Sequence, residues 1–183
     1  MTLETNRLLL RPWEESDAAT LYQHAKNPNI GPAAGWPVHE NEADSLAIIC
    51  GVLSAPETYA VVLKETDAPV GSVGLLIGAA SNLGIPSSEG EIGYWIAEPY
   101  WGQGLIPEAT RALIARGFDE LGLAVLWCGY FDGNEKSRRA QEKCGFRHHR
   151  TEREREWPLI HAVKTQHITR LRREEWERGR LGG

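Results

Sequence analysis

The chain has 183 residues, enough for one domain with a substantial core and few for two. Its 42% apolar and 25% charged residues are ordinary for a globular protein, and a net charge of −5 gives no general attraction to nucleic acid or to anionic membranes. Three scattered cysteines, and two adjacent histidines that point apart on a strand, His148 and His149, predict neither a disulfide framework nor a metal site.

The opening residues, MTLETNRLLLRPW, contain no long apolar run and no small-residue cleavage site. We therefore expect neither a signal peptide nor a membrane span, and a cytoplasmic location. These residues instead predict a strand over Arg7–Pro12 that ends at the proline. Ser16 or Asp17 can cap the helix that follows, in which Leu21 and Ala25 share a face.

The middle of the chain alternates loops with strand-forming runs. The Gly/Pro-rich segment NIGPAAGWPVHENE precedes a second helix, and two β-rich runs joined by Thr66–Pro69 predict a hairpin. The expected order is a loop over 29–42, a helix over Glu42–Leu53, hairpin strands over Tyr59–Lys64 and Val70–Ile77, a loop over Ala79–Gly90 and a strand over Glu91–Ala97.

The last part of the chain predicts a helix, a strand, a helix and two closing strands. Pro107 is typical of the first helical position, where its missing N–H costs nothing. AVLWCGYF, residues Ala124–Phe131, reads as a strand buried on both faces. Asn134 can cap a short helix that stops at Gly145, and closing strands follow over 146–157 and 162–171. The whole predicts a mixed α+β domain over residues 1–183.

The stretch YWGQGLIPEA, residues Tyr100–Ala109, places a glycine-rich turn between a strand and a helix. Such a turn points several backbone N–H groups at one spot beside the positive end of a helix dipole, which suits phosphates. The turn lacks the Gly-Lys-Ser/Thr of a P-loop, and Pro107 stands where the Rossmann fingerprint has its third glycine after Gly102 and Gly104. On the turn alone, glycines that serve only backbone geometry explain the pattern equally well.

Three segments in the right order resemble one family. EIGYWIAEPYWGQGLIPEATRALIARGF followed by NEKSRRAQEKCGF is similar to the GNAT (GCN5-related) N-acetyltransferase superfamily, in particular its RimJ/RimL-type branch of ribosomal-protein N-terminal acetyltransferases. LETNRLLLRPWEESDAATLY resembles the opening of that branch, and QHITRLRREEW resembles its end, so nearly the whole chain is covered. The resemblance implies the GNAT fold, a central twisted mixed sheet flanked by helices. It also implies acetyl-CoA in a cleft between two splayed parallel strands, Glu91–Ala97 and Ala124–Phe131.

The resemblance also implies which residues bind the cofactor. The family signature, Arg/Gln-x-x-Gly-x-Gly/Ala, falls on residues 101–106, whose backbone amides would hold the coenzyme A pyrophosphate. Trp101 replaces the usual Arg or Gln, and Ile106 replaces the final small residue. The expected contacts are the turn residues Trp101, Gly102, Gln103, Gly104, Leu105 and Ile106, the strand backbone at Ile96 and Ala97, the pair Asn134 and Ser137, and the cations Arg139 and Lys143.

Acetyl transfer from a thioester to an amine needs a neutral amine, a donor for the developing oxyanion and a proton for the departing thiolate. Asn134 and Ser137 lie three residues apart, so a helix start places both on one side. By resemblance, Ser137 is the general acid, and Asn134 binds the pantetheine or orders the loop. Two candidate bases stay open, Glu91 and Glu156. The period-two glutamates of TEREREW also fit a simple solvated face.

The acceptor is expected to be a primary amine. The branch favours a protein N-terminal α-amine; a small-molecule amine (polyamine, amino acid or antibiotic) is the alternative, and a non-catalytic acyl-CoA-binding module is a third reading. Trp36 could stack on the acceptor and His39 could orient it, or Trp36 anchors its loop on the core while His39 faces solvent. We expect no metal and no nucleic-acid or membrane partner, and we leave open whether the chain forms a homodimer.

Overall fold

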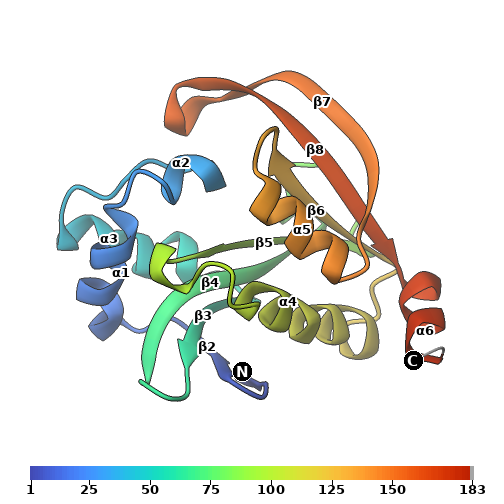
Figure 1. The fold of residues 1–183 in the computed structure, drawn as a ribbon, viewed down its shortest axis with the longest axis horizontal. Helices are drawn as coiled ribbons and strands as arrows, with labels where there is room; N and C mark the ends of the chain where they lie inside the picture. Colours follow the sequence, from blue (N-terminus) through green and yellow to red (C-terminus); the bar gives the residue numbers. More distant parts are fainter. Residues whose placement is uncertain (182–183) are drawn as a thin grey trace.

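Residues 1–181 are described by a computed structural model, which contains one sheet of eight strands in the order β1-β2-β3-β4-β5-β6-β8-β7 (Figure 1). Neighbouring strands are antiparallel except β5 and β6, which are parallel. The strands are β1 Leu3–Glu4, β2 Leu8–Arg11, β3 Thr58–Leu63, β4 Ala68–Ile77, β5 Glu89–Ile96, β6 Val125–Phe131, β7 Arg147–Trp157 and β8 Ala162–Arg172. The helices are α1 Ala18–Ala25, α2 Gly31–Ala34, α3 Glu42–Cys50, α4 Leu105–Ala115, α5 Glu135–Lys143 and α6 Arg173–Leu181. The mixed α+β class expected from the sequence is confirmed.

Several helices differ from the sequence expectation. Helix α3 ends at Cys50 instead of Leu53, and α6 follows the last strand, where no helix was predicted. The segment over 29–42, expected as a loop, contains the short helix α2. Helix α4 begins at Leu105, two residues before the expected start, because Gly104 has a φ of +76° and forms its N-cap. Pro107 therefore lies inside the first turn, where backbone N–H groups have no intrahelical acceptor and proline is still tolerated. Beyond its last α-helical residue, the helix continues as a π-helical turn over Arg116–Glu120.

Helices cover both faces of the sheet: α4 and α5 lie on one face, and α1 and α3 lie on the other (Figure 1). Strand β3 shows the consequence, since successive side chains point to opposite faces. Val61 joins the cluster that includes Leu113 of α4, whereas Ala60 and Val62 pack with the α1 and α3 side chains. None of the helices described is both long and apolar enough to cross a bilayer.

Strands β5 and β6 separate part-way along their length. Their parallel pairing ends at Ile92 and Cys128, whereas β5 stays paired with β4 as far as Ile96 and β6 stays paired with β8 as far as Phe131. A backbone N–H or C=O that loses its strand partner needs another partner or solvent. The splayed strands expected from the sequence are present, and the gap lies at the strand ends beside the turn that precedes α4.

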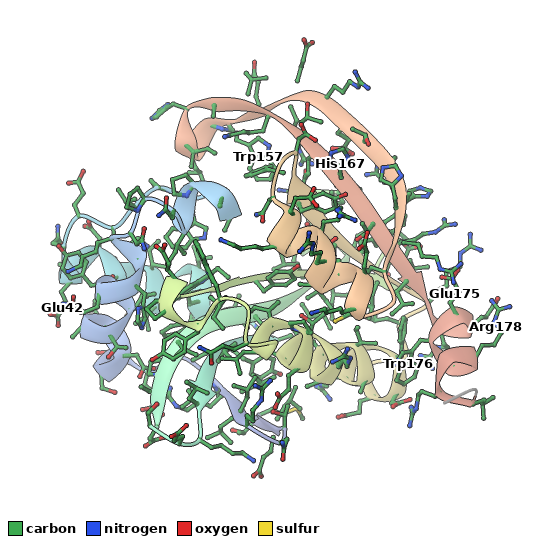
Figure 2. All side chains as sticks on the ribbon, viewed as in Figure 1. Glu42, Trp157, His167, Glu175, Trp176 and Arg178 are labelled. Carbon is green, nitrogen blue, oxygen red and sulfur yellow. The ribbon has the colours of Figure 1, made fainter. Side chains whose placement is uncertain are left out.

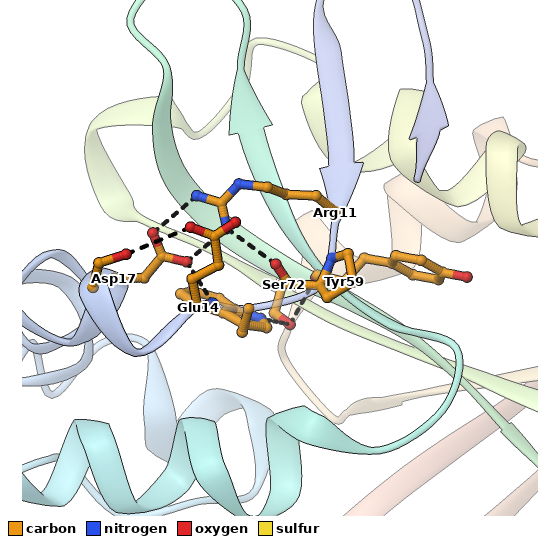
Figure 3. Close-up of polar contacts among 8 residues, drawn as sticks. Arg11, Glu14, Asp17, Tyr59 and Ser72 are labelled. Atoms are coloured by element: carbon orange, nitrogen blue, oxygen red, sulfur yellow. Dashed lines mark hydrogen bonds and ion pairs between the residues drawn. The ribbon is translucent and has the colours of Figure 1, made fainter. Parts of the chain in front are cut away.

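An ion pair between the partly buried Arg11 and the buried Asp17 holds the start of α1 on the sheet (Figure 3). The Arg11 guanidinium donates to both carboxylate oxygens of Asp17, at 2.7 and 2.9 Å, and the Glu14 N–H donates to the same carboxylate at 3.0 Å. Burial alone would raise the pKa of Asp17, but the hydrogen bonds from Arg11 and Glu14 outweigh burial and lower this pKa. Asp17, expected as an N-cap, makes no side-chain capping bond to α1 because its oxygens are held by these donors.

Three tryptophans connect this region with the segment over 29–42. The Trp13 indole N–H donates to Ser72 Oγ at 3.1 Å, and its ring stacks on Trp95 with the ring centres 6.3 Å apart. Trp95 in turn contacts Trp36 edge-on at 5.8 Å. Aromatic pairs of this kind add to the stabilisation that burial gives, so the row fixes where the segment over 29–42 lies against the sheet.

We predict that Asp17→Asn lowers the free energy of unfolding by about 2 kcal/mol at pH 7, because it removes the charged acceptor of the Arg11 pair. A lowered folded pKa stabilises the fold above the unfolded value of about 3.9, and this contribution is lost as the pH falls through the folded value. Urea unfolding at pH 7 and at pH 3 tests this, and the difference between parent and variant should shrink at the lower pH. Glu4→Gln is the control. It breaks the ion pair with Lys64, in which the Glu4 side chain is 70% exposed, and it should leave the free energy of unfolding unchanged. Equal losses at both pH values would contradict the assignment.

Candidate active site

A cavity of about 1160 Å³ lies where β5 and β6 separate. Its wall is formed by both strands, the turn before α4, the start of α5, α2 and the inner face of β7 and β8. The residues expected at a site that line this cavity are Glu91, Ile96, Trp101, Gly102, Gly104, Leu105, Ile106, Asn134, Ser137, Arg139 and Lys143. The tertiary structure therefore brings most of the expected residues to one place.

The turn before α4 presents backbone N–H groups to this cavity. Gly102 and Gly104 have φ angles of +78° and +76°, a conformation that glycine adopts without strain. Within the part of the chain that the structure describes, the N–H groups of residues 102–106 have no protein acceptor. A Cβ atom on Gly102 would meet nothing within 4 Å, so the turn is open on that side. Free donors at a helix N-terminus form an anion site.

Cations gather beside this turn. The Lys136 Nζ lies 3.5 Å from the centre of the Trp101 ring, and the Trp101 indole N–H donates to the Ile96 carbonyl at 2.9 Å. Arg139 and Lys143 follow on the same helix and also line the cavity. Trp101, which stands where the family signature has Arg or Gln, therefore holds a cation at the turn instead of supplying one.

The backbone at the end of β5 is only partly free. The Ile96 carbonyl is taken by Trp101, and the Ala97 N–H donates to the Val70 carbonyl at 2.8 Å. The backbone N–H and C=O groups of successive residues point to opposite edges of a strand. Because the Ala97 N–H points to β4, the N–H and C=O groups of Tyr94 and Ile96 point into the gap. The groups left for an added strand are therefore the N–H and C=O of Tyr94 and the N–H of Ile96. Ala97, expected as a contact, is fully buried and already bonded.

Ser137 and Asn134 lie at the start of α5. The Asn134 side chain caps this helix by accepting a hydrogen bond from the Ser137 N–H at 3.1 Å, so it orders the loop. The Ser137 Oγ lies 2.9 Å from the Tyr94 hydroxyl and accepts from the Gln141 amide at 3.2 Å. The serine hydroxyl is thus held at the cavity wall by side chains behind it.

Glu91 lines the same cavity from the other face of the sheet, because it lies three positions from Tyr94 on β5. Its carboxylate accepts a hydrogen bond from Ser81 Oγ at 2.7 Å. Burial raises the pKa of Glu91 above its ordinary value, more than the Ser81 hydrogen bond and the charge of Arg155 lower it. A carboxyl group with a raised pKa is a better proton acceptor near neutral pH than an ordinary one.

Glu156 does not reach the cavity. Strand β7 bulges, so that Glu152 pairs with Gln166 but Arg155 pairs with Lys164. The extra residue shifts the alternation of side chains by one position. Glu152 and Arg155 consequently share the inner face with Gln166, while Glu156 is exposed on the other face and is absent from the cavity wall. The glutamates of TEREREW do not share one face, and the structure gives no support to Glu156 as a base.

Trp36 and His39, expected at the acceptor, lie outside the cavity wall. Trp36 is packed against Trp95, and His39 is buried with its Nδ1 2.7 Å from Ser45 Oγ. Burial lowers the pKa of His39, which favours the neutral ring. Trp36 therefore anchors its segment on the core, as the alternative reading had it, but His39 does not face solvent. The neighbouring residues Pro28–Ile30 and Pro32–Ala34 contribute to the wall in their place.

Sequence reasoning missed four residues that the structure brings to this site. Tyr94 and Gln141 hold Ser137, and Lys136 lies at the turn. Trp157 lines the cavity near the tip of the arm formed by β7 and β8 (Figure 2), and its ring packs on Phe131 at 4.8 Å. Tyr94 reads in sequence as one more residue of a buried strand. The Tyr94 hydroxyl has a hydrogen-bond partner, Ser137, only because α5 packs over it.

Comparisons with known proteins identify the family and the fold of the chain. The family model described as "Acetyltransferase (GNAT) domain" matches residues 7–147. The "Putative ribosomal N-acetyltransferase YdaF" of Bacillus subtilis is 45% identical over 65 residues, which are 36% of this chain and 36% of that protein. An acetyltransferase of the GNAT family from Bacillus anthracis has a similar structure, with a TM-score of 0.83 at 21% identity over 95% of this chain and 99% of that one. The ribosomal-protein-S5-alanine acetyltransferase of Vibrio fischeri has a TM-score of 0.71 at 20% identity, over 96% of this chain and 98% of that one.

We predict that Glu91→Gln raises the melting temperature at pH 8 and leaves it unchanged at pH 4. An acid whose folded pKa is raised destabilises the fold above its unfolded pKa, about 4.3, and this cost grows until the pH passes the folded value. The glutamine can still accept the Ser81 hydrogen bond, so the variant removes only the buried charge. Thermal unfolding between pH 4 and pH 8 measures the effect, with Glu156→Gln as the exposed control, which should match the parent. A loss of stability at pH 8 in Glu91→Gln would show that Arg155 stabilises the ionised carboxylate more than burial opposes it.

Proposed function

Because the chain belongs to the GNAT acetyltransferase family, whose members use acetyl-CoA, we propose that it transfers the acetyl group directly to a primary amine, in the first place the N-terminal α-amine of a protein. The observation that carries this proposal is the gap between β5 and β6 beside the free N–H groups of residues 102–106. The YdaF match, which spans about a third of that protein, supports the ribosomal-protein branch.

The residues that line the cavity fit two parts of coenzyme A, its phosphates and its pantetheine arm. The free amides of 102–106 and the cations Lys136, Arg139 and Lys143 are suited to the pyrophosphate and the adenosine phosphate. The unpaired backbone groups of Tyr94 and Ile96 are suited to the two amides of the pantetheine arm, in the manner of an added strand. When bound, acetyl-CoA supplies an activated thioester carbonyl at the gap.

Glu91 and Ser137 divide the proton chemistry between the two faces of the sheet. Glu91, with its raised pKa, accepts the proton that the amine nitrogen loses as it bonds to the acetyl carbon, directly or through one water. Ser137 donates to the sulfur as the carbon–sulfur bond breaks. The two side chains lie on opposite faces of β5, so the amine and the thioester can approach the gap from opposite sides.

Direct transfer fits the site better than an acetyl-enzyme. The cavity of about 1160 Å³ exceeds the usual volume for one small ligand, about 300–1,000 Å³, so it has room for both substrates at once. The cysteine at its wall, Cys128, is fully buried, and burial raises its pKa far above the ordinary value. Its thiolate is therefore scarce, and a thiol is a poor nucleophile.

An α-amine suits this site because it needs little help to lose its proton. Its pKa is about 8, whereas that of a lysine side chain is about 10.4. The Glu91 carboxylate, which is hydrogen-bonded to Ser81 and acts through water, is a strong enough base to deprotonate an α-amine and a weak base for a lysine side chain. The cytoplasmic location expected from the sequence belongs to this proposal, as does the choice of a protein over a small molecule as acceptor.

We predict that Ser137→Ala lowers kcat roughly a hundredfold or more and changes KM for acetyl-CoA far less, because the hydroxyl acts on the leaving sulfur. Thiol release from acetyl-CoA measures this across a panel of peptides with free N-termini, N-blocked lysine peptides and small amines. Glu91→Gln should shift the rate–pH profile, and Glu156→Gln should behave as the parent. Tight binding of acetyl-CoA without turnover on any amine would favour a binding module, and parent-like turnover in Ser137→Ala would remove the assigned acid.

We predict that Gly102→Ala weakens coenzyme A binding about tenfold, because a left-handed φ costs a non-glycine residue roughly 1–2 kcal/mol and moves the amides of the turn. Calorimetric titration with coenzyme A gives the affinity. Gly122→Ala is the matched control: its φ is +69°, its Cβ would also meet nothing within 4 Å, and it lies outside the cavity wall. The two variants should lose similar stability, and only the first should lose affinity. Equal affinities would separate the turn from the cofactor.

A further inference from the structure

In the proposed reaction the Ser137 hydroxyl releases a proton, so the groups that hydrogen-bond to its oxygen affect how readily it does so. The pKa of a serine hydroxyl lies far above that of a thiol, about 8.5, so proton transfer from Ser137 to a departing sulfur is uphill unless the serine oxygen is stabilised as it loses the proton. Hydrogen bonds donated to an oxygen favour its charged form. The question is therefore which groups donate to Ser137 Oγ.

Gln141 is one such donor, and the structure fixes its orientation. The Gln141 Nε2 lies 3.0 Å from the Gly129 carbonyl and 3.2 Å from Ser137 Oγ. A flipped amide would place two carbonyl oxygens against each other at the first contact, so the nitrogen must face both groups. Thr169 Oγ1 lies 2.7 Å from Gln141 Oε1 and completes the buried arrangement. One amide hydrogen therefore goes to Gly129 and the other to Ser137.

Tyr94 is the second group, and its single hydrogen has two destinations. Its hydroxyl lies 2.9 Å from Ser137 Oγ and 3.2 Å from the Ser137 carbonyl. If Tyr94 donates to Oγ, then Oγ receives two hydrogen bonds from behind, and its own hydrogen is left to face the cavity. If Tyr94 donates to the carbonyl instead, the serine hydrogen can turn back toward the phenol. Burial raises the pKa of Tyr94 well above its ordinary value, so the phenol stays a donor.

We propose that Tyr94, together with Gln141, is a positioning residue of the transfer reaction: both donate to Ser137 Oγ, direct its hydrogen into the gap and stabilise the oxygen as the sulfur draws the proton away. The inference rests on the proposed function in one respect, that the group receiving the proton is the sulfur of acetyl-CoA. The arrangement of the three side chains is a property of the chain itself. Because the hydrogen bonds run through Ser137, Tyr94 has no effect on the sulfur when Ser137 is missing.

This dependence gives a test by a double-mutant cycle of the parent, Tyr94→Phe, Ser137→Ala and the double variant. Tyr94→Phe should lower kcat roughly tenfold to a hundredfold, the effect of one hydrogen bond to a group that gains charge, with KM for acetyl-CoA within about twofold. In the Ser137→Ala background the same change should alter kcat less than about twofold. A structural role would instead make the two effects multiply, which would overturn the proposal.

Tyr59→Phe is the matched control. Its hydroxyl is also hydrogen-bonded, to Glu57 at 2.7 Å, and its side chain is buried, but it lies outside the cavity wall. It should keep the parent kcat. A loss in Tyr59→Phe equal to that in Tyr94→Phe would show that the removal of any buried phenol hydroxyl slows the enzyme, and would overturn the proposal.

A binding measurement tests the same proposal without turnover. If Ser137, held by Tyr94 and Gln141, donates a hydrogen bond to the sulfur, it lowers the pKa of the bound coenzyme A thiol. The affinity of the protein for coenzyme A should then rise as the pH increases from 7 to 9.5. The affinity for desulfo-coenzyme A, which has no thiol, should not. Calorimetric titration of the parent should show this difference, and Tyr94→Phe should reduce it. An equal pH dependence in parent and Tyr94→Phe would contradict the proposal. A parent that acetylates no amine yet keeps the thiol-specific pH dependence would end the proposed function and leave Tyr94 in its role.

Discussion

The separation of β5 from β6 beyond Ile92 and Cys128 is the constraint on which the rest of the site depends. Each strand stays bonded to its outer neighbour, so neither can follow the other, and the backbone groups between them are left without partners. A folded protein tolerates such a gap only where solvent or a ligand satisfies these groups. The gap is a cost to stability, and its unpaired backbone groups are what the proposed pantetheine site uses.

Two helix starts meet at this gap, and they contribute in different ways. The turn before α4 offers main-chain donors, because Gly102 and Gly104 take up left-handed conformations. The start of α5 offers side chains: Asn134 closes the helix end, and Ser137 faces the cavity in the first turn. Trp101 links the two by holding Lys136 over its ring while it bonds to the end of β5. The proposed anion site and the proposed proton donor therefore belong to one connected set of contacts.

The alternation of side chains along β5 divides the site between the two faces of the sheet. Tyr94 points to the face of α4 and α5, where it meets Ser137, and Glu91 points to the opposite face, where it meets Ser81. Both residues are partly buried, and this burial raises the pKa of each. The raised pKa keeps the Tyr94 phenol protonated, so it retains a hydrogen to donate, and it makes the Glu91 carboxylate a better proton acceptor, so burial favours opposite roles in the two groups. The tryptophan row and the Arg11–Asp17 pair hold the second face in place from the periphery.

The sequence by itself determined the elements whose signals are local. Proline and glycine marked the ends of strands and the turn before α4, the apolar run 124–131 predicted a strand buried on both faces, and Asn134 predicted a helix start. Resemblance to one family then placed Ser137 and Glu91 near a shared ligand, and both line the cavity. What failed depended on contacts between distant residues. Glu156, expected as a candidate base, points away from the cavity because β7 contains a bulge. Trp36, expected at the acceptor, packs against Trp95 instead. Tyr94 acquired a partner only when α5 came to lie over β5, because a hydrogen bond across 43 positions leaves no periodicity in the sequence.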